Sequence, residues 1–170
     1  MNRSSRPTTN LPATPGMAAA TAATADPLDV AAQLNQLIET CIDTGRQFSF
    51  AAGDIVDGST RPFLVRVAEQ RSELAAELQQ MVTRLGGAPA THGTVAGTLR
   101  ESWMELRAAA AVREDHAILQ ELERCEDIVR DRFERVLRQA LPPDVQALVQ
   151  RQVVAVRGTH DEIRALRGRS

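Results

Sequence analysis

Apolar and polar positions recur with the period of an α-helix along four stretches of this 170-residue chain. Because a helix repeats every 3.6 residues, positions spaced alternately three and four apart lie on one of its faces. Each stretch carries one such seam. The seams are Leu34, Leu37, Cys41, Thr44, Phe48, Ala51 and Ile55; Phe63, Val67, Leu74, Leu78, Met81 and Leu85; Ile118, Leu122, Cys125, Val129, Phe133 and Val136; and Val145, Val149, Gln152, Val156, Thr159, Ile163 and Leu166. The pattern predicts four long amphipathic helices.

Turn-forming residues separate these helices. The segment "VDGST" at 56–60 interrupts the pattern after the first helix, "GGAP" at 86–89 ends the second, and "LPPD" at 141–144 divides the third from the fourth. The third helix is expected to begin near Arg113. Asp26 or Asp29 is the candidate cap of the first helix, with Pro27 in its first turn. Ser59 or Thr60 is the candidate cap of the second helix, and Pro143 or Asp144 opens the fourth.

The connection between the second and third helices is long and patterned. Within "THGTVAGTLRESWMELRAAA", Val95, Leu99, Trp103 and Leu106 predict a short amphipathic helix, with Trp103 covering the bundle surface. Four long helices, two tight turns and one such crossover predict an all-α fold, a ferritin-like four-helix bundle with a short crossover helix between helices 2 and 3.

The N-terminal segment differs from the rest in composition. Residues 1–28 are rich in Ala, Thr and Pro and lack the continuous apolar core of a signal peptide, so we expect a disordered tail, with the bundle domain at 29–170. Met17 is an alternative start, in which case residues 1–16 are not translated. No stretch is apolar enough to cross a membrane.

Composition narrows the chemistry further. Aromatic residues make up 3% of the chain and Tyr is absent, so the core is built from Leu, Val, Ile and Ala, which favours helices over a sheet. The net charge of −2 gives no electrostatic attraction for nucleic acid or a membrane surface. All 20 basic residues are Arg, which excludes catalysis by a lysine. Cys41 and Cys125 lie on seams and suit a reducing, cytoplasmic compartment.

Several segments together resemble a known family. They are "LNQLIETCIDTGRQF", "FLVRVAEQRSELAAEL", "LGGAPATHGTVAG", "WMEL", "ILQELERCEDIV" and "LPPDVQALVQRQ…THDEIRAL". In this order and spacing they resemble a bacterial family of four-helix-bundle proteins of unknown function, grouped by fold with the ferritin-like proteins. The resemblance spans about Leu34 to Arg167. It implies the fold and a stress-related role, and it carries no established activity.

A ferritin-like fold raises the question of a di-iron site. Such a site uses Glu-x-x-His on two helices and a Glu on each of the others. The motif is absent here, because Pro89, Arg113 and Arg157 stand three residues before the three histidines. A divergent site for iron, manganese or zinc would use Glu69, Glu126 and His160, with Gln152 nearby.

The alternative interpretation of these polar residues is structural. Thr44, Gln70, Gln152 and Thr159 would form a buried hydrogen-bonded layer that fixes helix pairing. Glu126 borders the seam of its helix and is the better candidate for an inward carboxylate, whereas Glu123 is turned toward solvent or the next helix. Of the two interpretations, the one that places the pair at the surface is preferred. An inward carboxylate needs a partner, and Arg71, Arg124 and Arg157 are the candidates.

No other motif in the sequence indicates catalysis, since G-x-S-x-G and a phosphate-binding loop are both absent. We therefore expect a non-enzymatic protein that acts by self- or partner association, as a homodimer or other homo-oligomer or with an unknown protein partner. The segment "AAAAV" at 108–112 is a candidate subunit contact. The metal-binding protein is the alternative function.

Overall fold

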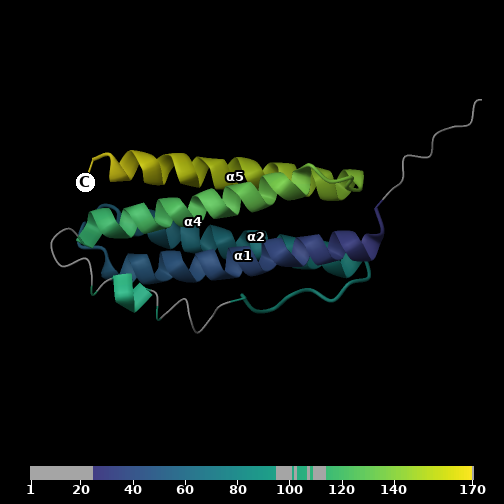
Figure 1. Cartoon of the computed structure of the whole chain (residues 1–170), viewed down its shortest axis with the longest axis horizontal. Helices are drawn as coiled ribbons and strands as arrows, with labels where there is room; N and C mark the ends of the chain where they lie inside the picture. The colour runs from purple at the N-terminus through teal and green to yellow at the C-terminus, as the bar shows by residue number, and fades with distance from the viewer. Residues whose placement is uncertain (1–24, 95–100, 102, 107, 109–113, 170) are drawn as a thin grey trace, which may run out of the picture.

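The computed structural model describes residues 25–94, 101, 103–106, 108 and 114–169. Four long helices cover most of this part: α1 (Pro27–Asp54), α2 (Arg61–Arg84), α4 (Glu114–Leu137) and α5 (Pro143–Arg167) (Figure 1). A short helical segment at 103–106 lies between α2 and α4. The described residues contain no strand, which confirms the all-α prediction. None of the described helices is long and apolar enough to cross a membrane.

The helices pack as two antiparallel pairs. α1 packs along α2, and α4 packs along α5, while α1 also contacts α4 and α2 contacts α5. Figure 1 shows that α2 ends at one end of the bundle and α4 begins at the other. The connection between them must therefore run back along the length of the molecule.

The predicted seams form the core. Every predicted seam position is buried except Leu85 and Leu166, which are half-buried. The core consists of two apolar clusters at opposite ends of the bundle. One includes Leu34, Leu37, Leu78, Phe133, Val149 and Val156, and the other includes Phe48, Leu64, Trp103, Leu122 and Ile163. The polar side chains between these clusters form the candidate site described below.

The helix starts follow the expected turn chemistry with small corrections. Asp26, not Asp29, caps α1 by accepting a hydrogen bond from the Leu28 amide at 2.9 Å, with Pro27 as the first residue. Helical structure therefore starts two residues before the predicted domain boundary at 29, while residues 1–24 of the predicted tail lie outside the described residues. Thr60 precedes α2, but its hydroxyl donates to Asp57 at 2.7 Å instead of capping the helix.

Polar side chains on α1 hold the connection to the bundle. Asn35 accepts from the Ala90 amide at 2.8 Å, and Asp43 accepts from the amide and hydroxyl of Thr94 at 3.0 and 2.8 Å. Asp54 accepts from the indole N–H of Trp103 at 2.8 Å. Asn35 and Asp54 are about 28 Å apart along the helix at 1.5 Å per residue, so the connection follows α1 from one end toward the other.

Trp103 packs against the bundle, as its sequence position predicted. Its side chain is 6% exposed and packs in the second apolar cluster against the bundle. The ring lies 6.2 Å from that of Phe50, centroid to centroid. Val95 and Leu99, which were predicted to share its helical face, lie outside the described residues.

Gly93 brings the connection against Asp43. A Cβ at Gly93 would lie within van der Waals overlap of the Asp43 carboxylate, so only glycine fits while Asp43 holds Thr94. We expect Gly93→Ala to lower the free energy of unfolding by about 1–3 kcal/mol, because the carboxylate must move and lose these hydrogen bonds. Urea unfolding followed by circular dichroism measures this. Gly58→Ala is the matched control, since a Cβ there meets nothing within 4 Å; equal losses in both variants would contradict the prediction.

Candidate functional site: a buried arginine–glutamate pair

A polar layer separates the two apolar clusters at the middle of the bundle. Each helix contributes one buried polar side chain to it. These are Thr44 from α1, Arg71 from α2, Glu126 from α4 and Thr159 from α5. Thr44 uses its hydroxyl within its own helix, donating to the carbonyl of Thr40 at 2.7 Å. The other three side chains belong to a network that crosses between helices.

Arg71 and Glu126 form the centre of this network. An Nη of Arg71 lies 2.6 Å from Oε2 of Glu126, and both side chains are 0% exposed. The other Nη of Arg71 donates to the amide oxygen of Gln70 at 2.9 Å, which also accepts from the Thr159 hydroxyl at 3.2 Å. The network therefore joins α2 to both α4 and α5.

The pair is enclosed but retains unused hydrogen-bonding atoms. Neither Nε of Arg71 nor Oε1 of Glu126 has a hydrogen-bond partner among the described protein atoms. Gly45 of α1 lets Arg71 lie close, because a Cβ at Gly45 would come within 3.3 Å of the Arg71 Cβ. Burial raises the pKa of the Glu126 carboxyl, while the Arg71 guanidinium acts in the opposite direction. An uncharged Glu126 would leave the buried charge of Arg71 without a partner. The two side chains are therefore stable in the core only as an ion pair.

The residues proposed as metal ligands lie in different environments. Glu69 is exposed on α2, whereas Glu126 is buried, which corrects the preferred surface position for that side chain. His160 is buried on α5, with Nε2 3.1 Å from an Asp127 carboxylate oxygen and Nδ1 3.3 Å from one of Asp161. Within the described residues, no three His, Cys, Asp or Glu side chains form a group suited to a metal ion. The structure places His160 against Asp127, the residue that follows Glu126, and leaves Glu69 outside the core.

Of the three arginines proposed as partners of Glu126, the structure selects Arg71. Arg124 pairs instead with Glu121, and Arg157 pairs with Glu134, each at 2.6 Å. Sequence reasoning did not place Arg71 on the buried face of its helix. The signal was present, because Arg71 stands four residues after Val67 and three before Leu74, which is the spacing of a seam position.

Two other polar predictions have clear outcomes. Glu123 is turned away from the core toward the next helix, where its carboxylate lies 2.9 Å from Nε of Arg167 on α5. Gln152 is buried, and its amide donates to Glu77 at 2.8 Å and to the carbonyl of Leu74 at 3.2 Å. Both arrangements join neighbouring helices, as expected of polar residues that fix helix pairing.

Both cysteines are free and buried beside this layer. Burial raises the pKa of Cys41 to about 12 and that of Cys125 to about 12. The nearby Arg71 lowers the pKa of Cys41 without offsetting the burial. A thiol with such a pKa is un-ionised at neutral pH and is a poor nucleophile, so these side chains act as small apolar residues.

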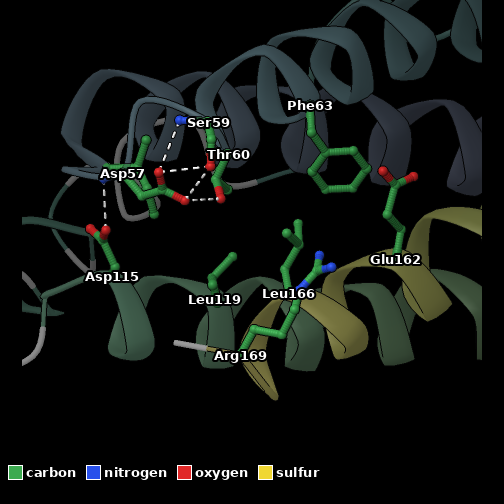
Figure 2. Close-up of a pocket in the computed structure, with 10 residues that line it drawn as sticks. Asp57, Ser59, Thr60, Phe63, Asp115, Leu119, Glu162, Leu166 and Arg169 are labelled. Atoms are coloured by element: carbon green, nitrogen blue, oxygen red, sulfur yellow. Dashed lines mark hydrogen bonds between the residues drawn. The ribbon is translucent and has the colours of Figure 1, made fainter.

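A cavity of about 490 Å³ lies at the end of the bundle, below the turn between α1 and α2 (Figure 2). Its lining includes Phe63 of α2 and Leu119 of α4, from opposite sides. The acidic groups around it are already engaged. Asp115 accepts hydrogen bonds from the amides of Val56 and Asp57 at 2.8 Å each, and Asp57 accepts from Ser59 and Thr60. These carboxylates stabilise the turn, which explains their position without a ligand.

The buried pair leads to a stability prediction. We expect Glu126→Ala to lower the free energy of unfolding by about 3–5 kcal/mol, because it leaves the Arg71 charge buried without a partner. Replacing both residues with apolar ones, as Arg71→Met/Glu126→Leu, should restore most of that loss. Urea unfolding measures both variants. Glu69→Ala is the control and should change stability by about 0.5 kcal/mol or less, since Glu69 is exposed. A double variant less stable than Glu126→Ala would contradict this account.

The two buried cysteines predict how the stability of the protein depends on pH. The chain has no Tyr, and all of its 20 basic residues are Arg, so the thiols are the side chains that titrate between about pH 9 and 11. The unfolded chain loses its thiol protons near an ordinary pKa of about 8.5, whereas the folded thiols keep theirs to about 12. The thiols should therefore leave the free energy of unfolding unchanged below about pH 8 and lower it as the pH rises above about 9.

Above about pH 9 each thiol should lower the free energy of unfolding by up to about 1.4 kcal/mol per pH unit. Urea unfolding at a series of pH values measures it. The Cys41→Ala/Cys125→Ala variant removes both groups and should show a flat profile over the same interval. An equal slope in the two proteins would show that the thiols are not the cause.

The comparison with known proteins concerns the segment that contains this pair. None of the curated proteins matches the chain. The family model described as "Domain of unknown function (DUF2383)" matches residues 29–139, which include α1 from its third residue, α2, α4 and both members of the Arg71–Glu126 pair. The match covers more than half of the chain. The protein therefore belongs to the DUF2383 family.

Proposed function

We propose that this protein is a bacterial, cytoplasmic, ferritin-like four-helix bundle that acts by association with itself or with a protein partner and is not an enzyme. The short helical segment at 103–106 is the crossover helix of that fold. The observation that carries the proposal is the fully buried Arg71–Glu126 ion pair at the centre of the bundle. A role in stress responses is part of the proposal through the family resemblance.

The centre of the bundle is the place where a di-iron protein of this fold gathers carboxylates and histidines from all four helices. In this chain the central carboxylate of Glu126 already contacts a guanidinium at 2.6 Å. Arg71 supplies there the positive charge that a metal ion would supply. The remaining members of the layer, Thr44 and Thr159, are neutral hydroxyls that bind divalent metals weakly. These features favour a structural centre.

Surface composition supports association. Among the described residues, several large apolar side chains are well exposed, including Leu28, Val56, Met104 and Val154 at 61%, 71%, 62% and 70%. Scattered exposed apolar residues are normal on a monomer, so each needs a specific argument, which is given for Val154 below. Of the predicted contact segment at 108–112, Ala108 is exposed and the rest lies outside the described residues.

Metal binding remains the second candidate function because of one observation. Oε1 of Glu126 has no hydrogen-bond partner among the described protein atoms. An iron, manganese or zinc ion bound between Glu126 and His160 would satisfy the free oxygen, provided that Arg71 moved away.

Metal content separates these functions. We expect untagged protein purified without chelators to contain only sub-stoichiometric metal by elemental mass spectrometry, because Arg71 already neutralises Glu126. The amount should be the same in the Glu126→Gln/His160→Gln variant and in Glu69→Gln, the exposed control. Near-stoichiometric metal that disappears in the double variant and persists in the control would establish the metal-binding function instead.

A further inference from the structure

The face of α5 that points away from the bundle carries a second regular row of residues. Its members are spaced four and three positions apart in alternation, like the buried seam on the opposite face. They are Ala147, Arg151, Val154, Gly158, Asp161 and Ala165. All six are exposed. Figure 1 shows α5, drawn in yellow-green to yellow, along one edge of the molecule, so a second helix has access to this row.

The row is complementary to itself when it is reversed. About Val156 as midpoint, Ala147 mirrors Ala165, Arg151 mirrors Asp161, and Val154 mirrors Gly158. Two copies of the row laid antiparallel would therefore place small residues opposite each other at both ends. Each arginine would face an aspartate, and each valine would face a glycine. A two-fold symmetric interface requires this property, because the same surface must fit itself.

We propose that this face of α5, which we call the outward row, is the contact between two copies of the chain, with the two α5 helices packed antiparallel about a two-fold axis near Val156. The inference rests on the proposed self-association and names its surface. The side chains of the two rows would interdigitate along the contact, as they do between antiparallel helices whose contact residues are spaced alternately three and four apart. The contact runs about 27 Å, from Ala147 to Ala165, at 1.5 Å per residue.

Shape favours this contact. Val154 is 70% exposed, which makes it one of the most exposed large apolar side chains described. A Cβ at Gly158 would meet nothing within 4 Å, so the backbone there leaves open space. In the antiparallel dimer each Val154 fills the space over Gly158 of the second copy. Small residues at the ends allow the two backbones to approach closely.

Charge selects the antiparallel orientation. The side chains of Arg151 and Asp161 are 64% and 82% exposed, so both can reach a neighbour. Arg151 also lies 3.1 Å from Glu77 of α2 and is thereby directed along the surface. In the antiparallel dimer the two Arg151–Asp161 contacts are equivalent and attractive. A parallel, in-register dimer would instead bring Arg151 against Arg151 and Asp161 against Asp161.

Charge reversal tests the surface. Sedimentation equilibrium of the full chain should show a dimer, and Arg151→Asp or Asp161→Arg alone should weaken dimerisation by about tenfold or more, because each change converts two attractive contacts into two repulsive ones. The combined Arg151→Asp/Asp161→Arg variant should recover the dimer. Arg164→Asp is the matched control, since this exposed arginine lies about 100° around the helix from Ala165.

Cross-linking tests the orientation. A mixture of Ala147→Cys and Ala165→Cys chains should cross-link efficiently with a short bismaleimide, whereas Ala147→Cys alone should not, because the two copies of residue 147 are about 27 Å apart. The native cysteines are buried and do not compete.

The possible results are distinguishable. A wild-type chain that stays monomeric at high concentration overturns self-association itself, and with it this surface. A dimer that is insensitive to the reversals, or that the combined variant does not restore, overturns the outward row alone and leaves association standing.

Discussion

The ion pair between Arg71 and Glu126 links α2 and α4, two helices whose backbones are not in direct contact. α2 and α4 lie diagonally in the bundle and are not among the helix pairs in direct contact. Arg71 reaches across this diagonal and places its guanidinium 2.6 Å from the carboxylate. Burying both charges costs several kcal/mol before their attraction is counted, so the pair adds little net stability. Its physical value lies in specificity, because a shift of either helix by one residue would leave two buried charges unpaired.

The diagonal arrangement also determines the path of the chain. α2 and α4 run in the same direction, so the segment between them must return along the bundle (Figure 1). Asn35, Asp43 and Asp54 lie along α1 and bind the described parts of that segment. α1 therefore uses one face for the core and another for the connection. The amide and carboxylate side chains on this second face of α1 are therefore explained by the connection that they bind. A helix surface without such a partner would accept any polar residue at these positions.

The seams predicted the helices and nearly all of the core because burial follows the 3.6-residue period directly. The partners of polar residues were harder to predict. Glu126 was the better candidate for an inward carboxylate, but the sequence favoured a surface position and offered three arginines as partners, of which the packing selects Arg71. Trp103 was expected to cover the bundle, but its bond to Asp54 joins residues 49 positions apart. Such contacts depend on how helices are rotated and offset in three dimensions, which the period of one helix does not specify.

The extent of the family match separates two kinds of property in this molecule. Residues 29–139 include the ion pair, the glycine that accommodates it and the α1 positions that bind the connection. They do not include α5, which supplies Thr159 to the central layer and carries His160 and the outward row. A function shared through the matched segment would therefore have to depend on α1, α2 and α4. The proposed self-association through α5 depends on a part of the sequence that the match does not cover, so it can belong to this chain without belonging to the family.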